Sequence, residues 1–171
     1  MNLKWQLIDD YCVLDLETTG FSPRFHEIIE VGILRIRDNN IVQRYSHLVA
    51  PQHSYINAKI QSLTGISPEM VADQPSIDEL RYEILDFIGQ DPIVGHNLSF
   101  DMNFLTAALC RDFDNICIDT LPLARQLFPE LGRHRLSDLT EYLCLSCNEH
   151  RALADCVATK ELFDVEKSRI L

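Results

Sequence analysis

Asp15 and Glu17 stand two positions apart at the end of an apolar run, residues 11–16, that is typical of a buried strand. Side chains alternate between the two faces of a strand, so both carboxylates point to the same side. Neighbouring carboxylates at the edge of a core repel each other and lose hydration, and a divalent cation is the simplest counter-charge. Their hard oxygen atoms suit Mg²⁺ or Mn²⁺. The spacing is equally compatible with a strand that ends here and leaves both acids in water.

Asp101 follows a second short apolar run, residues 92–95, and lies in the first turn of a helix predicted over 99–109. An acid in the first turn interacts favourably with the helix dipole, which is a sufficient structural reason for its presence. The carboxyl ends of parallel strands are also where ligands bind, and Asp101 lies close to such an end. We expect its neighbours His96 and Asn97 to fix the loop through hydrogen bonds.

Asp155 lies at the margin of the apolar side of a helix predicted over 152–166, where a carboxylate can face either a site or solvent. His150 is five positions earlier. On a continuous helix the two would be about 140° apart and would share no face. The polar residues 146–149 favour a loop that contains His150, with Asp155 fixed in the helix that follows.

A zinc site is an alternative reading of the same stretch, because Cys144, Cys147 and His150 have the spacing of zinc ligands. The fourth ligand would be His134 or Cys156. The pattern is incomplete, since it lacks a second pair of ligands. We expect Cys144 on the apolar side of a helix over 137–144, and most of the six cysteines as small core residues with free thiols.

A sheet with helices packed on it would position these residues, and the sequence pattern predicts such a sheet. Three strands, with a turn at 38–40, form an antiparallel meander, after which strands and helices alternate as in a parallel sheet. A capping box at Ser76 and Glu79 begins one of the helices. We predict a single α/β domain over 1–171 with a mixed five-stranded sheet, three strands antiparallel and two parallel, flanked by helices. The predicted strands are 11–16, 27–37, 41–49, 92–95 and 116–118, and the main helices are 76–88, 99–109, 119–127, 137–144 and 152–166.

The composition sets limits on partners. The 171 residues are 46% hydrophobic and 24% charged, as in an ordinary globular protein. The formal net charge of −11 argues against binding nucleic acid by broad phosphate neutralisation, although bound cations would supply positive charge locally. The beginning of the sequence lacks the pattern of a secretory signal, and no apolar stretch is long enough to span a membrane. We therefore expect a cytoplasmic protein without a membrane partner.

Three separated blocks, LDLETTG (14–20), GHNLSFDMNFL (95–105) and HRALADC (150–156), together resemble the DnaQ-like, or DEDDh, 3′→5′ exonucleases. This family includes the proofreading epsilon subunit and the PolC-type exonuclease domain of bacterial DNA polymerase III. The segments IIEVGILRI (28–36) and LTGISPEMV (63–71) resemble its intervening parts, so the likeness extends over nearly the whole chain. The resemblance implies a ribonuclease H-like fold.

The resemblance also implies roles for the residues. It makes His150 the general base and implies two Mg²⁺ or Mn²⁺ ions per site, held by Asp15, Glu17, Asp101 and Asp155. It implies that the terminal nucleotide is contacted by Thr18, Thr19, Phe21 and Phe104, although helical spacing fits Phe104 equally to the core. Many relatives have a histidine where this chain has Thr64, which puts one substrate contact in doubt.

The implied activity is release of nucleoside monophosphates from single-stranded 3′ ends, with DNA expected as substrate in proofreading or repair. The alternatives are a ribonuclease that acts on RNA, or a non-catalytic module that binds nucleic acid or zinc. Relatives bind a DNA polymerase subunit or form homodimers, and both remain open as partners. The stretch Arg133-His134-Arg135 would hold phosphate near the site or form a solvated loop.

Overall fold

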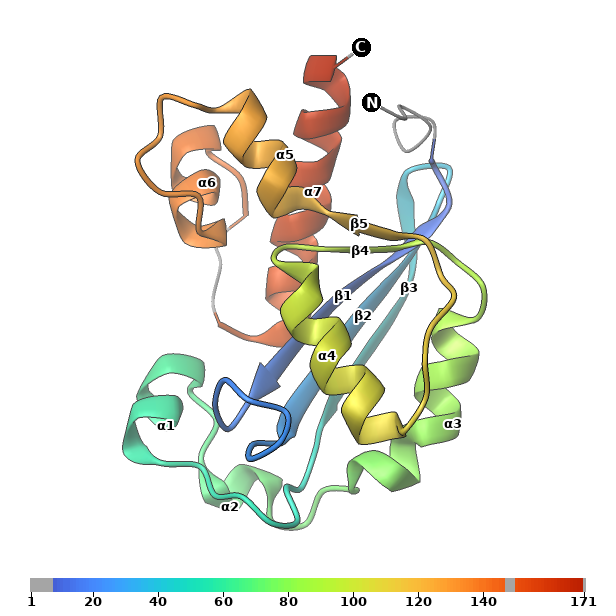
Figure 1. Ribbon diagram of the computed structural model, residues 1–171, viewed down its shortest axis with the longest axis vertical. Helices are drawn as coiled ribbons and strands as arrows, with labels where there is room; N and C mark the ends of the chain where they lie inside the picture. The colour runs from blue at the N-terminus through green and yellow to red at the C-terminus, as the bar shows by residue number, and fades with distance from the viewer. Residues whose placement is uncertain (1–7, 147–149, 171) are drawn as a thin grey trace.

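The computed structural model describes residues 8–146 and 150–170. Its centre is a five-stranded sheet in the order β3-β2-β1-β4-β5 (Figure 1). β1 pairs antiparallel with β2, and β2 antiparallel with β3, whereas β1, β4 and β5 are parallel. The predicted mixed sheet is confirmed. The strands are β1 (Tyr11–Thr18), β2 (Ile28–Arg37), β3 (Asn40–Leu48), β4 (Ile93–Gly95) and β5 (Cys117–Asp119).

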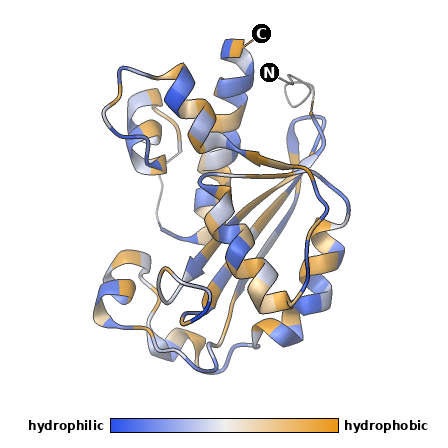
Figure 2. Cartoon of the chain, viewed as in Figure 1, coloured by the Kyte–Doolittle hydropathy of each residue, from blue (hydrophilic) through white to orange (hydrophobic). Residues whose placement is uncertain are grey.

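The helices cover both faces of the sheet and carry both hydrophobic and hydrophilic residues, whereas hydrophobic residues run along the strands (Figure 2). None of the helices within 8–146 and 150–170 is long and apolar enough to cross a membrane. The helices are α1 (Ala58–Thr64), α2 (Pro68–Val71), α3 (Ile77–Ile88), α4 (Leu98–Leu109), α5 (Thr120–Leu127), α6 (Leu136–Leu143) and α7 (Ala152–Ile170).

The alternation of β1 decides which residues meet which helix. Its even-numbered residues join the core beneath α3 and α4. The odd-numbered Tyr11 and Val13 belong to the opposite core, which includes Phe163 of α7. Asp15 and Glu17 continue the odd-numbered series, so the geometry of a strand turns them toward the α7 face of the sheet.

The hairpin between β2 and β3 has a two-residue turn, one residue shorter than predicted. Asp38 and Asn39 both have positive φ, 48° and 61°, and Asn40 already belongs to β3. Both central residues of a type I′ turn require positive φ, and Asn and Asp tolerate it better than other side chains. The turn therefore sets the register of the antiparallel strands.

The prediction that most cysteines are core residues is wrong for the described part of the chain. Cys12 and Cys156 are buried, but Cys110, Cys117 and Cys144 are exposed. Cys144 does not continue the apolar side of α6. It follows the last helical residue in the left-handed conformation, with φ of 55°, which turns its side chain away from the packed face.

Candidate active site

Three carboxylates from the first strand and the last helix converge at one point. Asp15, Glu17 and Asp155 each offer an oxygen atom, and these three atoms lie within 4.8 Å of one another. Asp155 is in the first turn of α7 and is buried. Asp155, which the sequence left open between facing a site and facing solvent, thus faces the acids of β1. Carboxylate oxygens at this separation can share a divalent cation.

Asp101 reaches the same region from the other side of the sheet. Its buried carboxylate accepts a hydrogen bond from the backbone nitrogen of Leu16 at 3.0 Å, and Leu16 lies between Asp15 and Glu17. The loop before α4 makes this approach possible: Asn97 adopts positive φ, and its backbone nitrogen donates to Asp119. Asp101 is outside the group of three within 4.8 Å, but it is attached directly to the strand that carries two of them.

Burial and mutual repulsion disfavour the charged forms of these acids. Burial, followed by Asp155 and other neighbouring acids, raises the pKa of Glu17 to about 8. Burial likewise raises the pKa of Asp101 to about 8 and holds the pKa of Asp15 well above its usual range. A bound cation would reverse this preference by neutralising the cluster. The donor set consists of hard oxygen atoms in one place, which fits Mg²⁺ or Mn²⁺.

His150 lies just before α7, which begins at Ala152, as predicted from the five-residue gap to Asp155. Its φ is 51°, a left-handed conformation that would not continue into a helix. The side chain is exposed and lines a groove that also contains Phe21. A histidine in this place is accessible to a ligand that approaches the carboxylates.

Glu30 of β2 anchors the beginning of α7 beside the acids. Its buried carboxylate accepts hydrogen bonds from Arg151 Nη2 at 2.7 Å and from the backbone nitrogen of Ala152 at 3.0 Å. Glu30 also pairs in register with Glu17 on β1. Sequence reasoning missed this residue, although an acid within the apolar run IIEVGILRI was an available signal. The ion pair fixes the chain directly after His150.

Gly32 lets α7 approach the sheet at the same place. A Cβ atom there would lie 2.5 Å from the carbonyl carbon of Ala152 and 2.6 Å from the nitrogen of Leu153. Backbone atoms at this distance exclude any side chain. The close approach brings the first turn of α7, with Asp155, onto the strand next to β1.

Thr18 and Thr19 use their hydroxyl groups to shape the loop after β1. Thr18 Oγ1 donates to the carbonyl of Gly20 at 2.7 Å. Thr19 Oγ1 accepts from the backbone nitrogen of Glu27 at 3.0 Å and shares a hydrogen bond with Ser54 Oγ. The loop presents Phe21 to solvent with 75% of its surface exposed. The two threonines thus hold the loop that carries an exposed aromatic ring.

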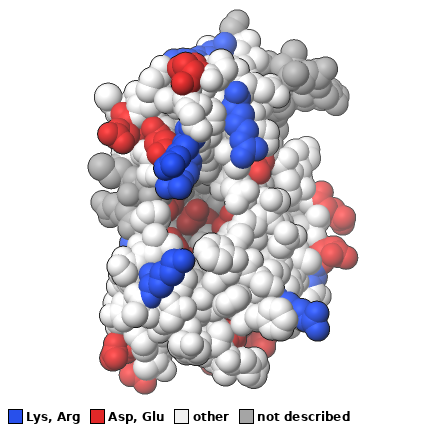
Figure 3. All heavy atoms as spheres, turned by 60° about the vertical axis from the view of Figure 1, so that its left-hand side comes forward, with Lys and Arg blue, Asp and Glu red and all other residues white. Residues whose placement is uncertain are grey.

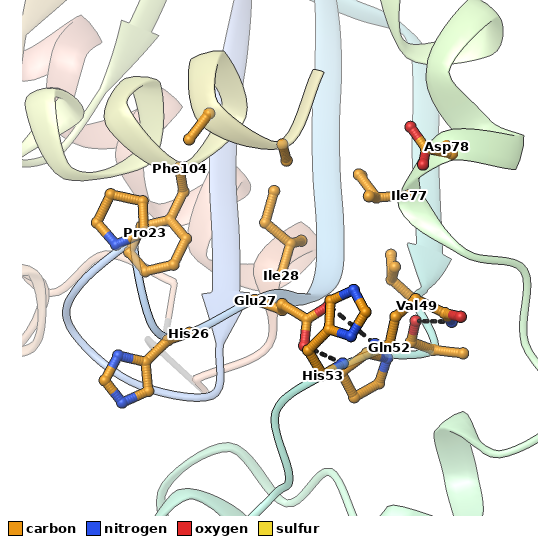
Figure 4. A pocket seen from close by; sticks show the side chains of 14 residues that line it. Pro23, His26, Glu27, Ile28, Val49, Gln52, His53, Ile77, Asp78 and Phe104 are labelled. Carbon is orange, nitrogen blue, oxygen red and sulfur yellow. Dashed lines mark hydrogen bonds between the residues drawn. The ribbon is translucent and has the colours of Figure 1, made fainter. Parts of the chain in front are cut away.

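Phe104 belongs to the core and lines a pocket separate from the groove at His150 (Figure 4). It is 2% exposed, and its ring centroid lies 5.0 Å from that of Phe100, one turn earlier on α4. The pocket has a volume of about 210 Å³, and Pro23 and Ile28 lie on its wall near Phe104. Phe104 is therefore a core residue, which was one of the two interpretations of its helical spacing. Its contact with a nucleotide remains a prediction.

The groove beside His150 has a volume of about 1030 Å³. Figure 3 shows acidic side chains at the bottom of a hollow on this face, with basic side chains above and below them. His96, on its wall, is tied to Thr120 Oγ1 at 2.8 Å and to the His134 carbonyl at 2.9 Å. The expected hydrogen bonds of His96 are therefore present. Leu63 also lines the groove and is a residue that sequence reasoning missed.

The zinc alternative receives no support from the described residues. The group that could hold a metal, where the structure describes the chain, is the carboxylate cluster. Burial holds the pKa of Cys156 well above its usual range, so its thiol stays protonated, and its Sγ lies 3.2 Å from the Gly32 carbonyl. Zinc binds the thiolate form. Cys147, the second predicted ligand, lies outside the described residues.

Comparisons with known proteins agree with this geometry. The model of the RNase T family, described as exonucleases, matches residues 12–163. The PolC-type DNA polymerase III of Clostridium perfringens is 40% identical over 158 residues, which are 90% of this chain and 11% of that protein. The epsilon subunit of DNA polymerase III from Aquifex aeolicus is 34% identical over 95% of this chain and 83% of its own length.

Among solved structures, exonuclease X in complex with 5′ overhanging duplex DNA matches with a TM-score of 0.77 and 29% identity. The match covers 92% of this chain and 91% of that one, and it confirms the ribonuclease H-like fold. The chain spans about a ninth of the PolC-type proteins, since 11% of their length is covered, but most of the epsilon subunit. The DnaQ-like resemblance is confirmed, and the chain belongs to the RNase T family of exonucleases.

Proposed function

We propose that this protein is a metal-dependent 3′→5′ exonuclease that releases nucleoside monophosphates from single-stranded 3′ ends, with DNA as the first candidate substrate. The observation that carries the proposal is the convergence of Asp15, Glu17 and Asp155, with Asp101 bonded to the same strand. These residues come from three distant segments of a chain that belongs to an exonuclease family. A structural role alone gives no reason to gather four acids of which two are buried and two partly buried.

The four carboxylates would hold two Mg²⁺ or Mn²⁺ ions. Ions bound there would neutralise charge on the scissile phosphate and its leaving oxygen and lower the pKa of the attacking water. The contribution of the chain is to fix the oxygen ligands: Asp15 and Glu17 by the strand, Asp101 by its bond to Leu16, and Asp155 by the first turn of α7. Each ligand is thereby placed before a substrate arrives.

His150 would act as the general base. An unprotonated ring nitrogen takes the proton of the attacking water while the water oxygen bonds to phosphorus and the bond to the 3′ oxygen breaks. Histidine suits this step because its ordinary pKa is near neutrality. Its exposure on the groove and its place directly before Arg151, which is held by Glu30, support the assignment.

The end of the strand would lie against the apolar part of the groove. Phe21 and Leu63 both line it and are exposed, 75% and 47%. An unpaired base can stack on such side chains, whereas a base within a duplex already stacks on its neighbours. This supports a single-stranded 3′ end as the substrate. DNA is the first candidate because exonuclease X was solved with 5′ overhanging duplex DNA and two similar relatives, 40% and 34% identical, are DNA polymerase III proteins.

Association with a DNA polymerase belongs to the same proposal. The matching proteins are PolC-type DNA polymerase III, in which this chain aligns with a small part, and an epsilon subunit of DNA polymerase III. An exonuclease held near a polymerase would encounter 3′ ends at high effective concentration. A net charge of −11 makes such help useful, because the free protein attracts DNA weakly over most of its surface.

The test uses DNA and RNA oligonucleotides of one sequence, labelled at the 5′ end, with Mg²⁺ and with chelator. We expect a ladder of 3′-shortened products when single-stranded DNA is incubated with Mg²⁺, and no products in the presence of chelator. His150→Gln should lower kcat by about 10²- to 10⁴-fold. Asp15→Asn should lower it at least as far, and Asp112→Asn, a change at an exposed acid after α4, should leave it unchanged. Internal cuts, or activity that persists with chelator or in Asp15→Asn, would refute the proposal.

A further inference from the structure

The wall of the groove at His150 has a charge opposite to that of the protein. Of the residues that the structure describes, twelve line the groove, and they include three arginines, three histidines and no aspartate or glutamate. The chain as a whole has 26 acidic and 15 basic residues. A wall without acids is therefore unusual for this chain. The arginines are Arg125 on α5 and Arg133 and Arg135 in the loop between α5 and α6.

These arginines are exposed and have no ion-pair partner among the described residues. Elsewhere in the described chain, Arg37 pairs with Asp91, and Arg81 pairs with Asp78. Three guanidinium groups on one wall create a local positive potential, which attracts anions. Guanidinium groups bind phosphate oxygens in forked geometry, which suits a nucleic-acid backbone.

The loop that carries two of the arginines is fixed by histidines. His134, between Arg133 and Arg135, shares a hydrogen bond with the Phe128 carbonyl at 2.9 Å through Nε2. Its own carbonyl is bonded to His96, which precedes the helix of Asp101. The backbone nitrogen of Arg135 donates to Asp138 at 3.1 Å, at the beginning of α6. These bonds attach the backbone of the loop that carries Arg133 and Arg135 to the wall of the groove.

The two parts of the groove differ in chemistry. Phe21 and Leu63 supply apolar surface, and the arginines supply positive charge, with His150 lining the same groove. A terminal nucleotide that is about to be released carries only the scissile phosphate. Every other phosphate of the strand lies on its 5′ side. Positively charged side chains next to the site are therefore suited to bind the phosphates of the part of the strand that remains after cleavage.

We propose that Arg125, Arg133 and Arg135 bind backbone phosphates of the single strand on the 5′ side of the scissile bond. This inference rests on the proposed function and deepens it, since it states how the strand is held. The recognised chemistry is the phosphodiester backbone, which DNA and RNA share. The arginine wall provides local attraction that the net charge of the protein opposes elsewhere.

The test compares the double variant Arg133→Gln/Arg135→Gln with Arg44→Gln. Arg44 is an exposed arginine on β3, at the opposite edge of the sheet from β5 and α5, and it forms no ion pair among the described residues. The substrates are oligonucleotides of about 12 nucleotides and a dinucleotide with a free 5′ hydroxyl group, whose only phosphate is the scissile one. Both are prepared as DNA and as RNA.

For the long strand, we expect the double variant to raise KM by about 10-fold with kcat unchanged, and to reduce the slope of log affinity against log salt by about 1.4. Dinucleotide cleavage should stay at the wild-type rate, and Arg44→Gln should match wild type throughout. Arg133→Lys/Arg135→Lys should restore most of the lost affinity, because the positive charge returns. An equal loss of affinity for DNA and RNA strands identifies the phosphates as the contact, whereas a loss on one of them alone overturns backbone recognition.

Binding without cleavage separates this inference from the proposed function. Fluorescence anisotropy of a labelled 12-nucleotide strand, of the length used above, is measured with chelator for wild type and the double variant. If no enzyme preparation cleaves 3′ ends but the double variant still binds the strand about 10-fold more weakly, the proposed function fails and the arginine wall stands. If cleavage is confirmed but KM, salt slope and anisotropy are the same in wild type and double variant, the arginine wall is wrong.

Discussion

Glu166 lies on α7 outside the candidate site, yet it is fully buried, and neither carboxylate oxygen has a hydrogen-bond partner among the described residues. Burial, and then the charge of Asp119, raise its pKa from 4.5 to about 9. The acids of the site can regain their charge by binding a cation, but Glu166 is not among the residues placed to do so. At the scale of single residues, the two kinds of buried acid have different consequences.

Glu166 should make the protein less stable as the pH rises. The unfolded chain loses the proton near pH 4.5 and the folded chain near pH 9, so the contribution of Glu166 is most favourable below 4.5 and declines between these values. At pH 7 the loss reaches about 3 kcal/mol. Glu166→Gln, which carries no charge, should therefore exceed wild type by about this amount at pH 7 and by little at pH 5.

Denaturant unfolding at a series of pH values measures this difference. Glu141→Gln is the matched control, because it removes one negative charge from an exposed position at the end of α6. A free-energy difference between Glu166→Gln and wild type that stays constant from pH 5 to pH 8 would contradict the expected titration.

At the scale of elements, the site depends on how closely α7 approaches β2. Gly32 admits the backbone of Ala152 and Leu153, and Glu30 binds Arg151 in the same place. Both interactions act on the short segment between His150 and Asp155. The distance from this segment to Asp15 and Glu17 is thus controlled by residues of a strand that carries none of the proposed ligands.

Gly32→Ala should push the beginning of α7 away from the sheet, because the new Cβ would lie about 2.5 Å from backbone atoms that cannot rotate away. We expect a loss of about 1–3 kcal/mol in the free energy of unfolding, as for other overpacked positions. kcat should also fall by about 10²-fold, since small misplacements of reacting groups are costly. Gly132→Ala is the control, because a Cβ there has no neighbour within 4 Å. Wild-type kcat at saturating substrate in Gly32→Ala would show that the close approach does not position the site.

Local sequence patterns predicted the elements and much of the site. Alternation in β1 placed Asp15 and Glu17 on one face, and the gap between His150 and Asp155 located the beginning of α7. These inferences succeed because a strand or a helix determines direction over a few residues. Cys144 was misjudged because the left-handed residue that ends α6 breaks that regularity.

Long-range pairing could not be predicted in this way. Glu30 and Arg151 are 121 positions apart, and nothing in either segment names the other as partner. The gathering of Arg125 with Arg133 and Arg135 depends on how α5 and the following loop fold back beside His150. Local patterns likewise did not decide whether Phe104 lies in the core or in the substrate cleft. Its packing against Phe100 and the sheet places it in the core.

At the scale of the whole molecule, metal binding and folding should be linked. A cation that binds only the folded site stabilises it by about 2.7 kcal/mol when its concentration is 100 times Kd. Mg²⁺ should therefore raise Tm relative to chelator. In chelator, Asp15→Asn should be more stable than wild type, because it removes one of the repelling, partly buried carboxylates. In Mg²⁺ wild type should be the more stable protein, because Asp15→Asn gains less from the ion.

Thermal unfolding of both proteins with Mg²⁺ and with chelator measures the linkage, and Asp112→Asn, an exposed acid, should behave as wild type does. Equal Mg²⁺-induced shifts in wild type and Asp15→Asn would mean that the ion binds elsewhere.

The ion pair between Glu30 and Arg151 also bears on how the protein is made. It joins β2, near the beginning of the chain, to the turn before the last helix, 121 positions later. Contacts of such high contact order form late, because a long loop must close before they can stabilise anything. A ribosome that has synthesised β1 to α6 has produced three of the four acids but neither His150 nor Asp155. A nascent chain therefore lacks the proposed general base and one proposed metal ligand until α7 has emerged and packed against the sheet, so we expect no hydrolytic activity before that step.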